Sequence, residues 1–211
     1  MRLCLVAALS LAGPAVAADP PTVAELFPLS VGRSWTYRVL TGPGPGEREK
    51  FVVRVTGEEM VGTTTCFRLE GWVGDRLVAA ECVGLTADGV SRFKIEKEEV
   101  TPPVPFLKPL KPSGKTNWSS RSYKIGSRSA SATFVAEPAK AEVTVKAGTF
   151  KTVVVEGVSR ETGSDPRKTT IWYAPGVGIV KQTIEGRQAG EGRPGVPGLA
   201  LELEEWGTGS K

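Results

Sequence analysis

The residues that could do chemistry in this chain are few, because its 211 residues include no histidine. That absence removes the commonest general base and a frequent metal ligand, and it excludes serine–histidine and cysteine–histidine triads. A glycosidase needs only two carboxylates. Glu70, Glu81 and Glu156 are the glutamates that the strand pattern leaves partly buried, so a carboxylate-based hydrolase stays open as an alternative. Most other acidic residues fall at expected turns or on the polar side of expected strands, and we predict no catalytic residue, no metal site and no cofactor.

The second candidate for chemistry is the pair Cys66 and Cys82, separated by F-R-L-E-G-W-V-G-D-R-L-V-A-A-E. In an exported protein such a pair is expected to form a disulfide. If V-G-D is the tip of a hairpin, Trp72 lies opposite Arg76, and counting back places the two cysteines directly opposite each other, within bonding range. Two free buried thiols are the alternative. A metal site is disfavoured, because two sulfurs without histidine leave the coordination incomplete.

The third candidate is a basic segment, since no acidic residue occurs between Val100 and Ala136. Basic side chains with interleaved aromatic rings can hold anionic polymers or lipid headgroups. A solvated loop that happens to lack acids is the alternative. The predicted patch for an anionic partner consists of Lys108, Lys111, Lys115, Trp118, Arg121, Tyr123, Lys124 and Arg128.

The N-terminal sequence M-R-L-C-L-V-A-A-L-S-L-A-G-P-A-V-A is typical of a secretory signal peptide. A positive start at Arg2 precedes a short apolar run, and Ala15-Val16-Ala17 matches a cleavage site. The run is too short to cross a bilayer, which takes about 20 residues, and no later stretch is apolar enough. We therefore predict a signal peptide over residues 1–17 and an exported protein without a transmembrane segment.

The hydrophobic periodicity of the rest of the chain is mostly two residues, which is typical of half-buried antiparallel strands. In S-R-F-K-I-E-K, for example, Phe93 and Ile95 are expected on the buried face, and Arg92 and Lys94 on the polar face. Turn signals such as G-D, D-G and P-G separate the runs. This spacing predicts one all-β, mainly antiparallel domain of about ten strands over residues 18–211, either a curved half-barrel or a sandwich.

Three segments depart from the strand pattern. T-P-P-V-P-F-L-K-P-L-K-P-S-G-K is expected to form a Pro-rich basic loop over about 101–116, outside the sheet, because proline cannot donate to a strand ladder. G-R-Q-A-G-E-G-R-P-G-V-P-G predicts a Gly-rich loop before the last strand. Only T-V-A-E-L-F-P-L near the start could be helical, for two turns at most.

T-T-I-W-Y-A-P-G-V-G-I-V-K-Q-T-I, residues 169–184, has glycines that could suggest a phosphate-binding loop. Such a loop leads from a strand into a helix, whose N-terminal N–H groups hold the anion. Here the residues after the glycines are mostly strand formers. Pro175 and Gly176 suit a type II turn, so we predict a hairpin corner. The same interpretation applies to G-P-G-P-G-E at 42–47.

Three segments in this order, L-F-P-L-S-V-G-R-S-W-T-Y-R-V, V-T-V-K-A-G-T-F-K-T-V-V-V-E-G and I-W-Y-A-P-G-V-G-I-V-K-Q, resemble a group of exported bacterial proteins of unknown function. The group shares an F-P-L-x-x-G-x-x-W-x-Y start, an A-G-T-F turn and a W-Y-A-P-G-V-G-I-V-K hairpin. The resemblance spans about residues 26–184 and implies a periplasmic or extracellular location in a bacterium. The group has no assigned catalytic residues. It is loosely similar to periplasmic lipoprotein carriers of the LolA and LolB type, in which a sheet wraps an apolar cavity. Some members are lipoproteins, but this chain lacks their lipid-acceptor cysteine.

Together these features predict an exported, non-enzymatic binding module that holds an apolar or amphipathic, lipid-like ligand on a concave sheet. The aromatic and β-branched residues at inward positions favour this function, and the same residues would also fill an ordinary β core. The alternative is a structural or interaction module of the cell envelope that binds a protein or an anionic polysaccharide. Nucleic acid is not an expected partner of an exported protein.

Overall fold

The structure, a computed structural model, describes residues 19–41, 49–186 and 197–208, apart from the side chains of residues 41 and 138–141. The predicted signal peptide, the G-P-G-P-G-E connection and most of the Gly-rich segment lie outside the described residues. Within the described part of the chain, no helix has the length and apolar character needed to span a membrane.

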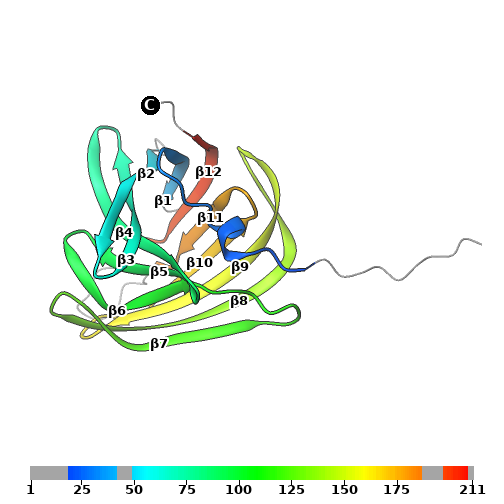
Figure 1. Cartoon of the computed structure of the whole chain (residues 1–211). Helices are drawn as coiled ribbons and strands as arrows, with labels where there is room; N and C mark the ends of the chain where they lie inside the picture. Colours follow the sequence, from blue (N-terminus) through cyan, green and yellow to red (C-terminus); the bar gives the residue numbers. More distant parts are fainter. Residues whose placement is uncertain (1–18, 42–48, 187–196, 209–211) are drawn as a thin grey trace, which may run out of the picture.

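The described residues form twelve strands of one antiparallel sheet, which closes into a barrel (Figure 1). Each strand pairs with its neighbours in the sequence, and β1 pairs with β12 to complete the ring. The strands are β1 (Arg33–Thr41), β2 (Lys50–Val61), β3 (Thr64–Val73), β4 (Arg76–Thr86), β5 (Gly89–Ile95), β6 (Glu98–Leu107), β7 (Thr116–Ile125), β8 (Arg128–Val145), β9 (Gly148–Glu161), β10 (Arg167–Ala174), β11 (Gly178–Ile184) and β12 (Leu199–Thr208).

The predicted all-β, antiparallel single domain is confirmed, with two corrections. The described strands number twelve rather than about ten, because β6 and β7 occupy a region expected to be largely loop. The sheet is a closed barrel rather than an open half-barrel or a sandwich, because β1 and β12 pair along their whole lengths, from Arg33↔Thr208 to Thr41↔Leu199.

The prediction that the Pro-rich segment stays outside the sheet is wrong for its first half. Residues as far as Leu107 belong to β6, and only 108–115 connect β6 to β7. Pro102 and Pro103 are exposed and follow the point where the described β6–β7 register ends, at Thr101↔Lys124. On its other side β6 pairs with β5 across two register shifts. The prolines therefore lie in a bulged, sparsely paired stretch, where a missing N–H is tolerated.

One end of the barrel is closed by α1 (Val23–Leu26), a single helical turn (Figure 1). Its start is a capping box: the Glu25 N–H donates to the Thr22 hydroxyl, and the Thr22 N–H donates to the Glu25 carboxylate. Val23 and Leu26 are buried, and α1 contacts β10 and β11. The N–H of Gly176 donates to the Glu25 carbonyl over 2.8 Å, which fixes the helix against the corner between these two strands.

The predicted hairpin corner at 175–178 is confirmed. β10 ends at Ala174 and β11 begins at Gly178, with the turn closed by the Val177 N–H donating to the Ala174 carbonyl over 3.1 Å. Gly176 has a φ of 76° and Gly178 a φ of 107°, which are left-handed conformations that glycine adopts without steric cost. No helix follows the glycines, so the corner lacks the anion site of a phosphate loop.

Candidate functional site

The interior of the barrel contains a cavity of about 470 Å³. It extends from Phe27, beside α1, to the opposite end of the barrel, where β10 begins and β11 ends. Its size lies within the range of about 300–1,000 Å³ that is usual for small-molecule sites. Its lining is mostly apolar and aromatic: Phe27, Trp35, Tyr37, Phe51, Val53, Leu69, Gly71, Ala79, Ala80, Glu81, Arg92, Ile95, Glu96, Arg167, Ile179, Gln182, Ile184 and Leu201.

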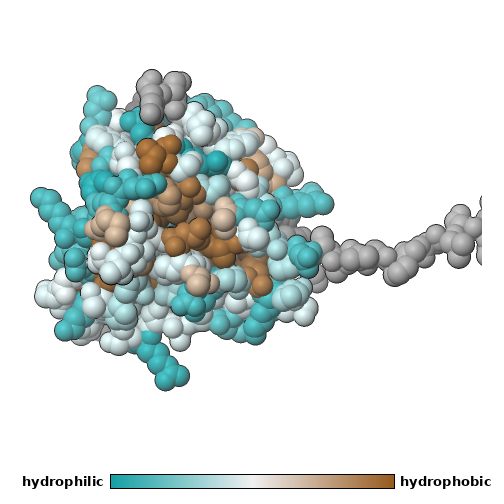
Figure 2. Space-filling view, viewed as in Figure 1, coloured by the Kyte–Doolittle hydropathy of each residue, from teal (hydrophilic) through white to brown (hydrophobic). Residues whose placement is uncertain are grey.

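Alternation along the strands separates this lining from the outer wall. On β11, Gln182 and Ile184 line the cavity, whereas Lys181 lies on the outer wall and donates to Glu202 over 3.1 Å. The same period of two places charged residues outside and apolar residues inside on most strands. In the face shown in Figure 2, apolar residues gather over the middle of the barrel and hydrophilic residues lie around them.

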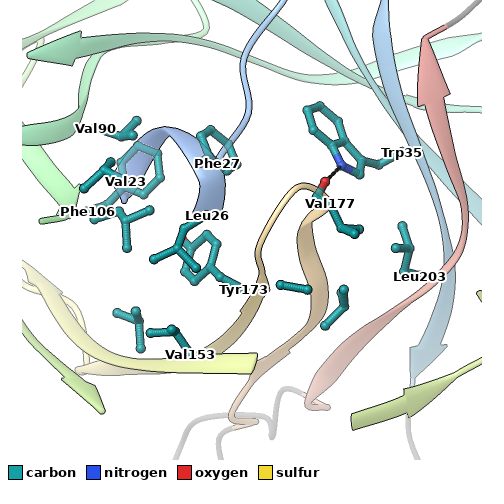
Figure 3. Close-up of a cluster of buried hydrophobic side chains, with 14 of the residues drawn as sticks. Val23, Leu26, Phe27, Trp35, Val90, Phe106, Val153, Tyr173, Val177 and Leu203 are labelled. Atoms are coloured by element: carbon teal, nitrogen blue, oxygen red, sulfur yellow. Dashed lines mark hydrogen bonds between the residues drawn. The ribbon is translucent and has the colours of Figure 1, made fainter. Parts of the chain in front are cut away.

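Aromatic rings close the cavity at the α1 end (Figure 3). The Phe27 ring stacks on Trp35 with 6.2 Å between centroids, and it meets Phe106 and Tyr173 edge-on at 5.7 and 6.2 Å. The Trp35 Nε1–H donates to the Val177 carbonyl over 2.6 Å, which ties β1 to the β10–β11 corner. Phe27 therefore forms the floor of the cavity at the α1 end.

An ion pair lies on the wall of the cavity, among mostly apolar residues. The Arg92 Nε donates to Glu81 Oε2 over 2.5 Å, and the two side chains remain 34% and 30% exposed because the cavity reaches them. The Arg92 guanidinium lies 5.2 Å from the centroid of the Phe106 ring, a cation–π contact that fixes its position. Burial opposes the charge on Arg92, but the Glu81 carboxylate outweighs burial and raises the pKa of Arg92 above its ordinary value.

The inward position of Arg92 corrects the prediction that Phe93 faces the interior and Arg92 the outside. The β4–β5 register shifts between Cys82 and Val83, so that Cys82 opposes Lys94 while Val83 opposes Arg92. Phe93 is the extra residue of this bulge, and it packs on the outer side with the two cysteines. A β-bulge reverses the inward and outward phase of a strand, and simple alternation cannot locate one. Arg92 was the main site residue that sequence reasoning missed.

Two buried tyrosines stand between the cavity and the packed end. The Tyr37 hydroxyl donates to the Ile179 carbonyl over 3.0 Å, whereas the Tyr173 hydroxyl is buried without a hydrogen-bond partner among the described residues. Burial is the main cause that raises the pKa of both phenols. Both hydroxyls are therefore neutral at physiological pH.

No protein-family model and no curated protein matches this chain. Two solved structures resemble it. One, at 12% sequence identity and a TM-score of 0.42, is a protein from Parabacteroides distasonis described as a lipoprotein; the match covers 90% of this chain and 100% of that one. The other, at 11% identity and a TM-score of 0.42, is a protein from Bacteroides fragilis described as exported with a YmcC-like fold; the match covers 89% and 99% of the two chains. Similarity this low assigns no function to the cavity.

The cysteines lie on the outer face of the β3–β4 wall and are both free, buried thiols, so the predicted disulfide is absent from the structure. The hairpin tip is Gly74-Asp75 rather than V-G-D, and the β3–β4 register also shifts once, between Gly71 and Trp72. Cys82 therefore opposes Arg68, two positions from Cys66. Diagonal neighbours of this kind lie about 7–8 Å apart, at or beyond the reach of a disulfide.

The Cys82 thiol takes part in a small polar network beneath Phe93. It donates to Glu59 Oε1 over 2.8 Å, and the same oxygen accepts from the Lys94 ammonium over 2.9 Å. Burial and this hydrogen bond raise the pKa of Cys82 to about 12. The thiol is therefore protonated and unreactive at neutral pH.

The predicted patch for an anionic partner is divided between the two sides of the sheet. Trp118 and Tyr123 are buried: Trp118 stacks on Phe134 and donates from Nε1 to the Pro105 carbonyl over 2.8 Å, and Tyr123 belongs to a buried cluster of β6, β7 and β8. The aromatic members therefore cannot contact a partner bound outside the barrel.

The basic members of the patch differ in their surroundings. Lys115 pairs with Glu137, and Arg128 pairs with Glu98 at 2.7 Å and Glu161 at 3.1 Å. Lys108 is partly buried, and Lys111 and Lys124 are exposed. Arg121, also exposed, lines a polar hollow of about 550 Å³ together with Arg160 and several hydroxyl side chains. Anionic-partner binding remains a prediction for the basic members alone.

The three glutamates considered for hydrolysis do not share a cleft. Glu70 lies outside and accepts from Arg68 over 2.7 Å, Glu156 is exposed, and only Glu81 faces the cavity. The other carboxylate of the cavity wall is Glu96, which sequence reasoning did not single out.

Proposed function

We propose that this protein is an exported, non-enzymatic binding module that holds a small apolar or amphipathic molecule inside its barrel. The observation that carries the proposal is the cavity of about 470 Å³, which is closed at one end by Phe27 and lined mainly by aromatic and aliphatic side chains. Burial of apolar ligand surface contributes about 25 cal/mol per Å², so such a lining favours an alkyl or ring system. The signal-peptide sequence at residues 1–17 supports export.

The proposal is tested by filling the cavity. Ala79 faces the cavity, since its Cβ lies 3.2 Å from the position of a Cβ added to the opposite Gly71. Ala79→Trp should occlude the site and abolish binding of an environment-sensitive naphthylamine dye. Thr183→Trp is the matched control, because Thr183 lies between two lining residues of β11 and faces outward. Equal dye binding by both variants would refute an interior site.

Native mass spectrometry of the protein purified from its own host addresses the natural ligand. A bound small molecule that is retained by Thr183→Trp and lost by Ala79→Trp is the expected result. Hydrolysis of a bound ester or glycoside, abolished by Glu96→Gln, would instead favour the carboxylate hydrolase.

A further inference from the structure

The charges on the cavity wall cancel. Its lining residues include two carboxylates, Glu81 and Glu96, and two guanidinium groups, Arg92 and Arg167. Glu96 and Arg167 are exposed, whereas Glu81 and Arg92 pair with each other inside the cavity. Beside this ion pair, a carboxylate head would lie close to the negative charge of Glu81. An ammonium head would lie close to the positive charge of Arg92. A charge that enters a low-dielectric site without a free counter-charge loses far more hydration energy than a neutral group that finds hydrogen bonds there.

The same wall offers hydrogen bonds that no described residue uses. An arginine has five N–H donors, and the Nε of Arg92 alone is bonded, to Oε2 of Glu81. Neither the Nη groups of Arg92 nor Oε1 of Glu81 has a hydrogen-bond partner among the described residues. Gln182 adds a neutral amide, which can both donate and accept. Donors and acceptors thus lie side by side, as a hydroxyl or amide head requires.

The size of the cavity limits the rest of the ligand. At about 30 Å³ for each group the size of a water molecule, a volume of about 470 Å³ holds on the order of sixteen such groups. One alkyl chain with a small head fits this volume, and a lipid with two chains does not.

We infer that the ligand is a single-chain amphiphile with an uncharged hydroxyl or amide head, which binds at the Arg92–Glu81 pair. The Arg92 guanidinium lies 5.2 Å from the Phe106 ring, which meets Phe27 at 5.7 Å, so the head lies near the closed end. The alkyl chain extends from there toward Phe51 and Ile184. This inference rests on the proposed function, because it assigns a chemical class to the ligand of the same cavity.

The test compares three probes with the same chain: lauryl alcohol, laurate and laurylamine. Each competes with the naphthylamine dye for the wild-type protein at neutral pH, where laurate and laurylamine are charged. Lauryl alcohol should compete about tenfold or more tightly than either charged probe, a difference of about 1.4 kcal/mol. Equal competition, or the best competition by laurate, overturns the inference and leaves cavity binding intact. Failure of dye and probes alike refutes the proposed function itself.

A charge substitution gives a second readout in the opposite direction. Glu81→Gln keeps the side-chain shape and leaves Arg92 without its counter-charge, so laurate should gain about tenfold in affinity and become the preferred probe. Glu202→Gln is the matched control: Glu202 also holds an ion pair, with Arg38 at 2.6 Å, but lies on the outer wall. An unchanged probe order in folded Glu81→Gln would overturn the assignment of the head to this pair. If this variant does not fold, the wild-type comparison decides.

Discussion

At the end of the barrel closed by α1, the Phe27 ring meets three aromatic rings and is 6% exposed. At the open end, the ring of Phe51 has one aromatic neighbour, Tyr37, and its free side faces the cavity. The width of a barrel grows with its number of strands, and about eight strands give an interior that side chains alone can fill. A twelve-stranded barrel needs additional residues inside. α1 supplies them at one end, and the cavity remains where none of the described residues fills the interior.

Alanine substitution of the two phenylalanines should show the difference in packing between the two ends most clearly. Phe27→Ala should lower the free energy of unfolding by about 3–5 kcal/mol, because it leaves a void among packed rings. Phe51→Ala should cost roughly 1–2 kcal/mol, since part of the ring already borders empty space. Urea denaturation followed by tryptophan fluorescence measures both. Equal losses would contradict the distinction between a packed end and an open end.

The two corner glycines test how tightly the closed end is assembled. A Cβ at Gly178 would lie 3.0 Å from Trp35 Nε1, whereas a Cβ at Gly176 would meet no atom within 4 Å. Gly178→Ala should therefore lower the free energy of unfolding by about 2–3 kcal/mol through backbone strain and displacement of Trp35. Gly176→Ala should cost about 1 kcal/mol for the left-handed backbone alone. Thermal unfolding of the two variants against wild type gives the difference, and the reverse order would refute the packing at the corner.

Alkaline pH should lower the free energy of unfolding, because of the two buried tyrosines between the two ends of the barrel. An ordinary tyrosine ionises near pH 10, but burial raises the pKa of Tyr37 and Tyr173. Above about pH 10 only the unfolded chain releases these protons, so their stabilising contribution is complete below that pH and is lost as pH rises. The free energy of unfolding should fall by about 1.4 kcal/mol per pH unit for each tyrosine.

Tyr173→Phe should remove one tyrosine's share of this alkaline loss and change stability at pH 7 very little, because its hydroxyl has no partner among the described residues. Tyr37→Phe should also reduce the alkaline loss, but it should cost about 1 kcal/mol at pH 7, since it leaves the Ile179 carbonyl unpaired. Urea denaturation at pH 7 and pH 11 separates the two effects. An unchanged pH dependence in both variants would exclude these tyrosines as its cause.

The smallest effect is expected on the outer face of the β3–β4 wall. Because the pKa of Cys82 is raised to about 12 and both cysteines are buried, the folded protein should show no measurable reaction with a thiol reagent at pH 8. Both thiols should react once the chain is unfolded in denaturant without reductant. Rapid reaction of the folded protein would show that the β3–β4 wall opens easily, and no reaction after unfolding would show a disulfide.

Alternation of apolar and polar residues was sufficient to predict the fold class, and the turn chemistry of Pro175 and Gly176 was sufficient to predict the hairpin corner. Alternation failed at three bulged places, because an extra residue shifts every later side chain to the other face. The shift at Gly71 separated the cysteines, the shift at Cys82 turned Arg92 inward, and the shifts in β5–β6 accommodated the prolines. The apolar lining of the cavity was thus predictable, whereas its ion pair depended on bulges that the pattern does not reveal.

The pairing of β1 with β12 also affects when the barrel can close during synthesis and folding. A ribosome makes β12 after the other eleven described strands, so the growing polypeptide cannot complete the ring until synthesis has passed Thr208. Until then β1 and β11 present unpaired edges, which invite association between chains, and contacts so distant in the sequence form slowly. Closure of the ring between β1 and β12 is therefore expected to be a slow step of folding.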